Sequence, residues 1–178
     1  MPRKVSFLIS LVILISLAFT QIVYAQPTTG LNAPYGPRVN DLKNKADIVE
    51  NLQKIEKLRA NLTVVNINGN STQEQLKSIN KDLDYYIEQF NEIDKNLEKH
   101  IITYKESFPD VFFADEISFV AKSYIISIRE QQNLIRALQD NNESAKQLFY
   151  SDYLIPVYFY LNLADNMVSY IEAYFVIT

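Results

Sequence analysis

The sequence predicts an all-α protein, an antiparallel up-down-up-down four-helix bundle preceded by an N-terminal signal sequence and a Pro/Gly linker. Two long segments carry apolar residues at alternating spacings of three and four, which is the pattern of a helix with one buried seam. Composition agrees, because Gly30, Gly36 and Gly69 are the only glycines and none follows. Long helices with short connections favour an up-down bundle.

Residues 1–25 have the anatomy of a secretory signal. Arg3 and Lys4 precede an almost wholly apolar run, and Val23-Tyr24-Ala25 predicts cleavage after Ala25. An uncleaved signal anchor is the alternative, because the uncharged run up to Tyr24 is long enough to span a bilayer. Either fate places the rest outside the cytoplasm, secreted or anchored on the outer face of the cytoplasmic membrane.

Residues 26–38 contain Pro27, Pro34 and Pro37 together with two glycines, which indicates a flexible linker. The helical domain is therefore expected at 39–178. Its first helix is predicted from about Asn40 to Leu62, with Asn40 or Asp41 as the N-cap. Arg59 lies within the apolar stripe of this helix, so its guanidinium must reach water or a carboxylate.

The second helix is predicted from Ser71 or Thr72 to about Ser107, with Glu74 or Gln75 completing a capping box. Pro109 ends it, because proline disfavours helical geometry at the preceding residue. The apolar seam is the clearest pattern in the chain. It comprises Leu76, Ile79, Leu83, Tyr86, Phe90, Ile93, Leu97, His100 and Tyr104.

The segment 108–113, FPDVFF, is predicted to be an apolar turn between the second and third helices. The third helix is expected at about 114–141 and the fourth at about 144–175. Pro156 should kink the fourth helix or split it, with Pro156 in the first turn of the second piece. The seam of the third helix comprises Ile117, Ala121, Tyr124, Ile128, Gln131, Ile135 and Leu138.

The fourth helix has more apolar surface than one buried face requires. Its polar residues form one narrow stripe, and apolar residues flank that stripe on both sides. Large aromatic residues of this kind are typical of protein interfaces. The turn at 108–113 and this helix together predict a partner-binding surface that comprises Phe112, Phe113, Tyr160, Met167, Tyr170 and Tyr174.

Three Asn-X-Ser/Thr sequons are candidate glycosylation sites in an exported chain, at Asn61, Asn70 and Asn142. Up-down connectivity would bring all three to one end of the bundle. The chain's entry, the FPDVFF turn and the C-terminus would lie at the other end. Asparagine is also common in turns, so chance is the competing explanation for these triplets.

The sequence offers little chemistry. There is no cysteine and only one histidine, and no phosphate loop, nucleophile elbow or zinc-protease motif occurs. His100 sits in the seam of the second helix, where a structural role is expected. A haem held by His100 and Met167 is a remote alternative. We therefore predict no enzyme, and no catalytic residue, metal or cofactor.

The leading functional hypothesis is an exported, non-enzymatic bundle that acts through protein–protein contact at the cell envelope, as an accessory subunit of a membrane complex. Membrane contact is expected through the N-terminus if the signal is retained. The net charge of −4 with no basic stripe argues against nucleic acid. The alternative is a small-ligand-binding sensor or carrier domain, in which Asp152 or Asp165, both among aromatic residues, would bind the ligand.

Overall fold

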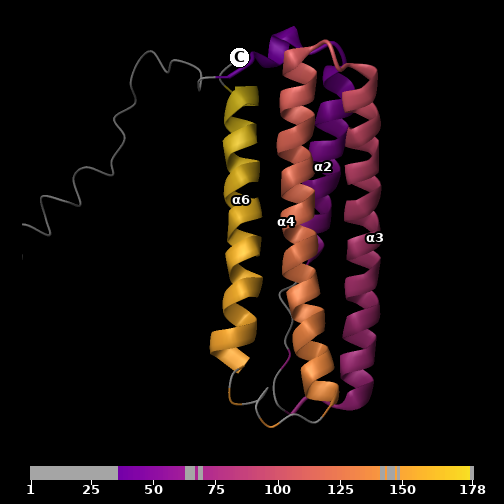
Figure 1. The fold of residues 1–178 in the computed structure, drawn as a ribbon, viewed down its shortest axis with the longest axis vertical. Helices are drawn as coiled ribbons and strands as arrows, with labels where there is room; N and C mark the ends of the chain where they lie inside the picture. Colours follow the sequence, from indigo (N-terminus) through magenta and orange to yellow (C-terminus); the bar gives the residue numbers. More distant parts are fainter. Residues whose placement is uncertain are drawn as a thin grey trace, which may run out of the picture. The chain divides into compact units, whose positions relative to one another are not determined.

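The computed structural model describes residues 36–62, 67, 70–140, 143, 147 and 149–176. The described residues belong to the unit that spans Pro34–Thr178; the other unit, Met1–Ala33, lies outside them, as does the predicted signal. Four α-helices and no strand occur among the described residues, which confirms the all-α class (Figure 1). The α-helices are α2 (Lys45–Asn61), α3 (Gln73–Thr103), α4 (Phe108–Gln139) and α6 (Ile155–Val176).

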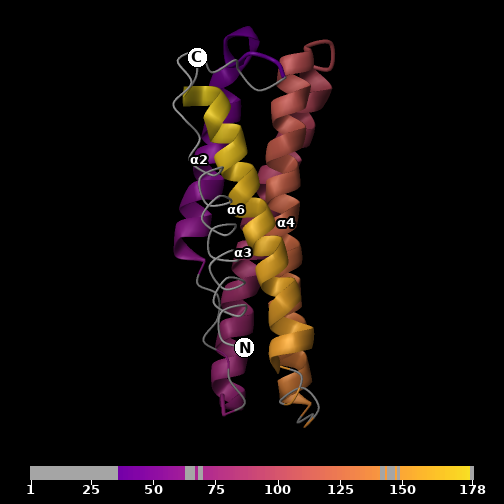
Figure 2. The same ribbon diagram turned by 90° about the vertical axis from the view of Figure 1, so that its left-hand side faces the viewer.

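Consecutive helices run in opposite directions, as contacts between their ends show. Gln73 at the start of α3 donates a hydrogen bond to the carbonyl of Gln139 at the end of α4, 3.3 Å away. The first turns of α4 meet the last turn of α6, where the ring centroids of Phe113 and Tyr174 are 5.3 Å apart. Helix α4 is central, packing against α3 and α6, and α2 covers α3 and α4 (Figure 2).

The first helix begins later than predicted. Val39–Asp41 form a short 3-10 turn, and α2 begins only at Lys45. The N-cap is Asn44, whose side-chain oxygen accepts a hydrogen bond from the Asp47 amide at 3.4 Å. Asparagine at this position satisfies one of the free amides of the first turn. Asn40 and Asp41 are therefore not the cap, because the chain still turns across the end of the bundle there.

The second helix follows its prediction closely. Thr72 caps α3, and a capping box pairs the Thr72 hydroxyl with the Gln75 amide and the Gln75 side chain with the Thr72 amide. The helix ends at Thr103, four residues before the predicted Ser107. Most of the predicted seam is buried and the rest is partly buried. The fully buried members are Leu76, Leu83, Phe90, Ile93, Leu97 and His100.

The FPDVFF segment is helical rather than a turn, which corrects the prediction. Helix α4 begins at Phe108, and Pro109 stands in its first turn, where the missing amide hydrogen costs nothing. The turn between α3 and α4 instead lies at Tyr104–Ser107. All seven residues of the predicted α4 seam are buried, including Gln131.

Pro156 splits the last helical segment in the manner of the second predicted alternative. A π-helical segment, Phe149–Leu154, precedes α6, and Pro156 is the second residue of α6. Its ring fixes a backbone angle suited to a first helical turn and has no amide hydrogen to leave unpaired there. Among the described residues, no helix is both long and apolar enough to cross a membrane.

A buried carboxylate joins the start of α2, the end of α3 and the start of α4. The side chain of Asp110 is fully buried and accepts hydrogen bonds from the amides of Lys43 and Asn44, at 2.9 and 3.1 Å. The hydroxyl of Ser107 donates to the same carboxylate. Burial would raise the pKa of Asp110, but these hydrogen bonds and that from His100 outweigh it, so the pKa lies below its usual value.

His100 is held between two aspartates. Its Nδ1 lies 2.6 Å from Asp47 of α2, and its Nε2 lies 3.1 Å from Asp110 of α4. A ring with a proton on each nitrogen would donate to both carboxylates. The side chain is fully buried, and both nitrogens are engaged within the protein. This is the structural role expected for His100.

Part of the predicted linker is packed against the helices. Pro37 is buried, as is Val39 just after the linker, and Gly36 lies against the ring of Tyr174 in α6. A Cβ atom at Gly36 would stand 2.6 Å from the Tyr174 hydroxyl and 3.0 Å from the ring carbon Cε1. The described part of the chain therefore enters the helical unit beside the end of α6.

Replacing Asp110 with Ala should lower the free energy of unfolding by about 3–5 kcal/mol, because buried donors and His100 lose their partner. Since the pKa of Asp110 is lowered in the folded protein, its stabilisation is complete above the unfolded pKa. It is lost as the pH falls through the folded pKa. In urea unfolding, the difference in the free energy of unfolding between wild type and Asp110→Ala should therefore become smaller as the pH is lowered. Asp115→Ala, at an exposed position of the same helix, is the control and should change little.

Gly36→Ala should destabilise the protein by about 1–3 kcal/mol, because the new methyl group forces the Tyr174 ring to move. The second substitution Tyr174→Phe removes the closest atom, so the double variant should lose less stability than the two single losses added together. Thermal unfolding of the four proteins measures this coupling. If the losses of stability in the two single variants simply added up in the double variant, the contact between residue 36 and the Tyr174 hydroxyl would be contradicted.

Candidate partner-binding surface

Helix α6 is anchored to the rest of the protein by its inward face. Val157, Leu161, Ala164 and Ile171 are buried against the core, where small residues on α4 allow close approach. Ser127 of α4, which is one of these small residues and is buried, donates a hydrogen bond to the carbonyl of Val157 at 2.8 Å. This packing fixes the rotation of α6 and so decides which of its residues face solvent.

An ion pair further fixes one flank of α6 against α2. Asp165 accepts hydrogen bonds from Arg59 Nε at 2.7 Å and from Arg59 Nη2 at 2.9 Å, a two-pronged geometry. The Tyr124 hydroxyl donates to the same carboxylate at 2.6 Å. Burial would raise the pKa of Asp165, but the bonds from Arg59 and Tyr124 hold it below its usual value. Arg59 thus reaches a carboxylate, one of the two outcomes expected for it.

The same flank carries a second carboxylate that faces α2. Glu172 lies two turns beyond Asp165, and the pKa of Glu56 on α2 is raised by burial and by the neighbouring Glu172 carboxylate. Asp165 and Glu172 therefore mark the side of α6 that α2 occupies. The opposite flank faces away from α2.

Aromatic side chains lie on the exposed side of α6. Tyr158, Phe159 and Tyr160 follow one another, so they span about 200° of the helix circumference and one buried face cannot cover all three. Phe159 is 61% exposed and Tyr158 is 45% exposed, while Tyr160 is partly buried. One turn earlier, Ile155 is 64% exposed.

These aromatic residues continue along the flank that faces away from α2. Tyr170 is 40% exposed, and its hydroxyl lies 2.7 Å from that of Tyr174. We name this surface the outer face of α6. It comprises Phe159, Tyr160, Leu163, Met167 and Tyr170, of which Tyr160, Leu163 and Met167 are partly buried.

Two of the six predicted partner-binding residues are in the core. Phe113 is fully buried and Tyr174 is 3% exposed, because they pack on each other and on Phe175 or Phe112. They therefore do not belong to the outer face of α6. Phe112 is partly buried at the end of the bundle, whereas Tyr160, Met167 and Tyr170 remain together on α6.

Sequence reasoning missed Phe159, the most exposed member of the outer face of α6, and the neighbouring exposed Ile155. Both stand out only when the rotation of α6 is known, although the run of three aromatic residues was a usable signal for Phe159. Phe119 of α4, also missed, is 45% exposed. Its flanking residues Ser118 and Val120 are buried, so it points away from the core.

The predicted ligand residues are not brought together. Asp152 is exposed in the π-helical segment, and Asp165 lies 13 residues later, about 20 Å along the helix. Asp165 is already engaged by Arg59 and Tyr124. Within the described residues, no group of three or more His, Asp or Glu side chains is placed to hold a metal.

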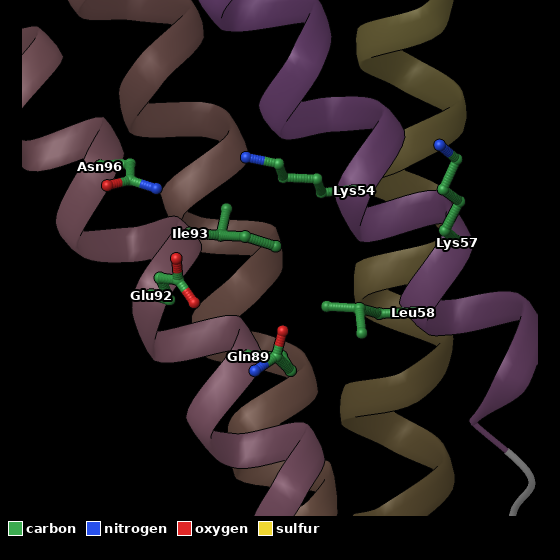
Figure 3. A pocket seen from close by; sticks show the side chains of 7 residues that line it. All are labelled: Lys54, Lys57, Leu58, Gln89, Glu92, Ile93 and Asn96. Atoms are coloured by element: carbon green, nitrogen blue, oxygen red, sulfur yellow. The ribbon is translucent and has the colours of Figure 1, made fainter.

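A groove of about 240 Å³ lies between α2 and α3, away from these aspartates (Figure 3). Leu58 and Ile93 point toward one another across it, and Lys54 extends from α2 toward α3. Lys54 forms an ion pair with Glu50 at 2.7 Å. The groove is open to solvent, and its remaining lining residues are polar. They are Lys57, Gln89, Glu92 and Asn96.

Two of the three candidate glycosylation residues are described, and both are exposed. Asn61 is the last residue of α2, and its side-chain amide donates to the Lys57 carbonyl at 2.9 Å. Asn70 lies in the turn before α3. Asn142 lies outside the described residues. Asn70 is at the end of the bundle opposite Gly36, whereas Asn61 lies partway along it, where its carbonyl accepts a hydrogen bond from the Tyr86 hydroxyl of α3 at 2.8 Å. The prediction that the sequons share one end is therefore wrong for Asn61.

No protein-family model matches the chain, no curated protein is similar to it, and no solved structure matches its fold at a significant level.

Asp165→Asn should lower the free energy of unfolding by about 1 kcal/mol, since the ion pair with Arg59 is partly exposed and solvent weakens it. Combined with Arg59→Met, the two losses should be less than additive. Asp115→Asn, at an exposed position of α4, serves as the matched control. Additive losses in urea unfolding would show that the two side chains act separately.

Proposed function

We propose that this chain is an exported, non-enzymatic helical protein that binds a protein partner at the cell envelope through the outer face of α6. One observation carries the proposal: an anchored helix exposes Phe159 and Tyr170 on the flank that no other described helix occupies. Aromatic residues of this kind dominate the binding energy of interfaces when a partner removes them from water. An accessory subunit of a membrane complex fits this arrangement.

The proposed location comes from the N-terminal sequence. Residues 1–25 would direct export, and 26–35 would connect that segment to the helical unit. A glycan on Asn70 would then lie at the end opposite Gly36 and one on Asn61 beside α3, so both would leave the outer face of α6 free. The small-ligand alternative has weaker support, since Asp165 is engaged by Arg59 and the groove beside Lys54 is open.

A photo-crosslinking amino acid placed at Phe159 or Tyr170 in intact cells should form a covalent adduct with one defined partner. The same group at Tyr85 of α3, which is 54% exposed on a different helix, should not form that adduct. Adduct size and peptide mass spectrometry give the readout. Equal labelling from all three positions would reject the outer face as the specific contact.

Tyr170→Glu should weaken co-purification with that partner by at least tenfold while leaving the unfolding temperature within a few degrees of wild type. The expected loss is typical of an interface anchor residue, which contributes about 2 kcal/mol or more. Tyr85→Glu is the matched control. A variant that keeps full partner binding would contradict the proposal, as would a domain that recovers no partner in either form.

A further inference from the structure

The three large apolar side chains with the greatest exposure among the described residues all lie at one end of the helical unit. Val176 is 84% exposed, Ile102 is 73% exposed and Phe108 is 68% exposed. They come from different helices, at the last turn of α3, the first residue of α4 and the last residue of α6. The folding of any single helix does not explain why all three gather there.

Ring contacts lead from Phe108 at the start of α4 to the last turn of α6. The ring of Phe108 lies 6.1 Å from that of Phe112, and the ring of Phe112 lies 5.9 Å from that of Tyr174, two residues before Val176. We name the apolar surface at this end of the unit the end face. It comprises Ile102, Phe108, Phe112 and Val176, and in Figure 1 it lies where α3, α4 and α6 reach the same end.

The described chain enters the helical unit at this same end. Gly36 packs against Tyr174, and the apolar run that finishes at Tyr24 lies only a short connection earlier. Residues 25–35 can span at most about 40 Å when fully extended. A membrane that held the apolar run would therefore always be within reach of the end face.

Charged residues around the end face are of both signs. Exposed side chains of both signs lie at this end, among them Arg38, Lys43, Lys45, Lys99 and Lys105, with Asp41, Glu98, Glu106 and Asp115. Arg38 and Asp41 pair with each other at 3.1 Å. A lipid surface would thus be bound by insertion of apolar side chains rather than by attraction to anionic head groups. Long lysine side chains can border such a contact, with their charges in the head-group region.

We propose that the end face rests on the lipid surface of the membrane, with its apolar side chains in the interfacial region. Aromatic and aliphatic side chains at this depth leave water while nearby polar groups stay hydrated. The inference rests on the proposed location at the envelope and adopts the uncleaved alternative for the N-terminal segment. It assigns lipid contact to residues separate from the outer face of α6.

The absence of cysteine makes this directly measurable. Single-cysteine variants of the full chain at Ile102, Phe108 and Val176 would carry an environment-sensitive fluorophore. They would be reconstituted into phosphatidylcholine vesicles that contain acyl chains bearing a quencher. The expected result is a blue-shifted emission with strong quenching at all three positions. Labels at Glu74, at the opposite end of α3, and at Tyr85, on the side of α3, should show neither effect.

Phe108→Asp supplies a second test without threatening the fold, because the side chain is exposed and an acidic residue suits the start of a helix. It should reduce lipid quenching of a label at Val176 by severalfold, whereas Tyr85→Asp should leave that quenching unchanged. Quenching that appears only with added phosphatidylglycerol, or that is equal at Glu74 and Val176, would overturn the proposal.

Vesicle flotation of the same samples reports whether the N-terminal segment holds the chain on lipid at all. Floating chains with unquenched end-face labels would refute the end-face contact alone. Chains that do not float would refute the retained anchor on which it rests. Crosslinking from Phe159 and Tyr170 reports on the outer face of α6, so the two proposals fail independently.

Discussion

The carboxylate of Asp110 is the constraint on which the arrangement of the helices depends. Helix α2 is the shortest of the four and makes fewer contacts with its neighbours than α3, α4 and α6 make among themselves. The start of α2 is nevertheless fixed. Asp110 accepts hydrogen bonds from the Lys43 and Asn44 amides just before α2, and His100 binds Asp47 in the first turn of α2. A buried charge with this many donors is costly to disturb. Together with the Arg59–Asp165 pair further along, it holds α2 at two points.

The sequence was most informative where a single periodic pattern determined burial. The seams of α3 and α4 were predicted correctly because each helix buries one continuous stripe, and spacing alone reports that stripe. The capping box at Thr72 was also predictable, since its chemistry is local. By contrast, the Asp110 carboxylate accepts hydrogen bonds from the amides of Lys43 and Asn44, which are 67 and 66 residues away in the sequence. No local pattern could reveal a contact over that separation.

The FPDVFF segment shows why a local rule failed. Pro109 was expected to end one helix and begin a turn, because proline disfavours helical geometry at the residue before it. Proline is also favoured in the first turn of a helix, and that is where it stands in α4. The same limit applied to the candidate surface. Tyr160, Met167 and Tyr170 were identified from their helical spacing beside a polar stripe, whereas the burial of Phe113 and Tyr174 and the exposure of Phe159 depend on how α6 packs against α4.

The contact between Gly36 and Tyr174 has a topological consequence. It places Gly36, near the start of this unit, beside the last turn of the final helix, so the two ends of the unit adjoin. Domains whose ends adjoin in this way tolerate circular permutation and insertion into other chains. A short peptide joining Val176 to Gly36 could therefore connect these ends, and new ends could be opened in the connection between α4 and α6. Every helix-to-helix contact would be preserved in the permuted chain.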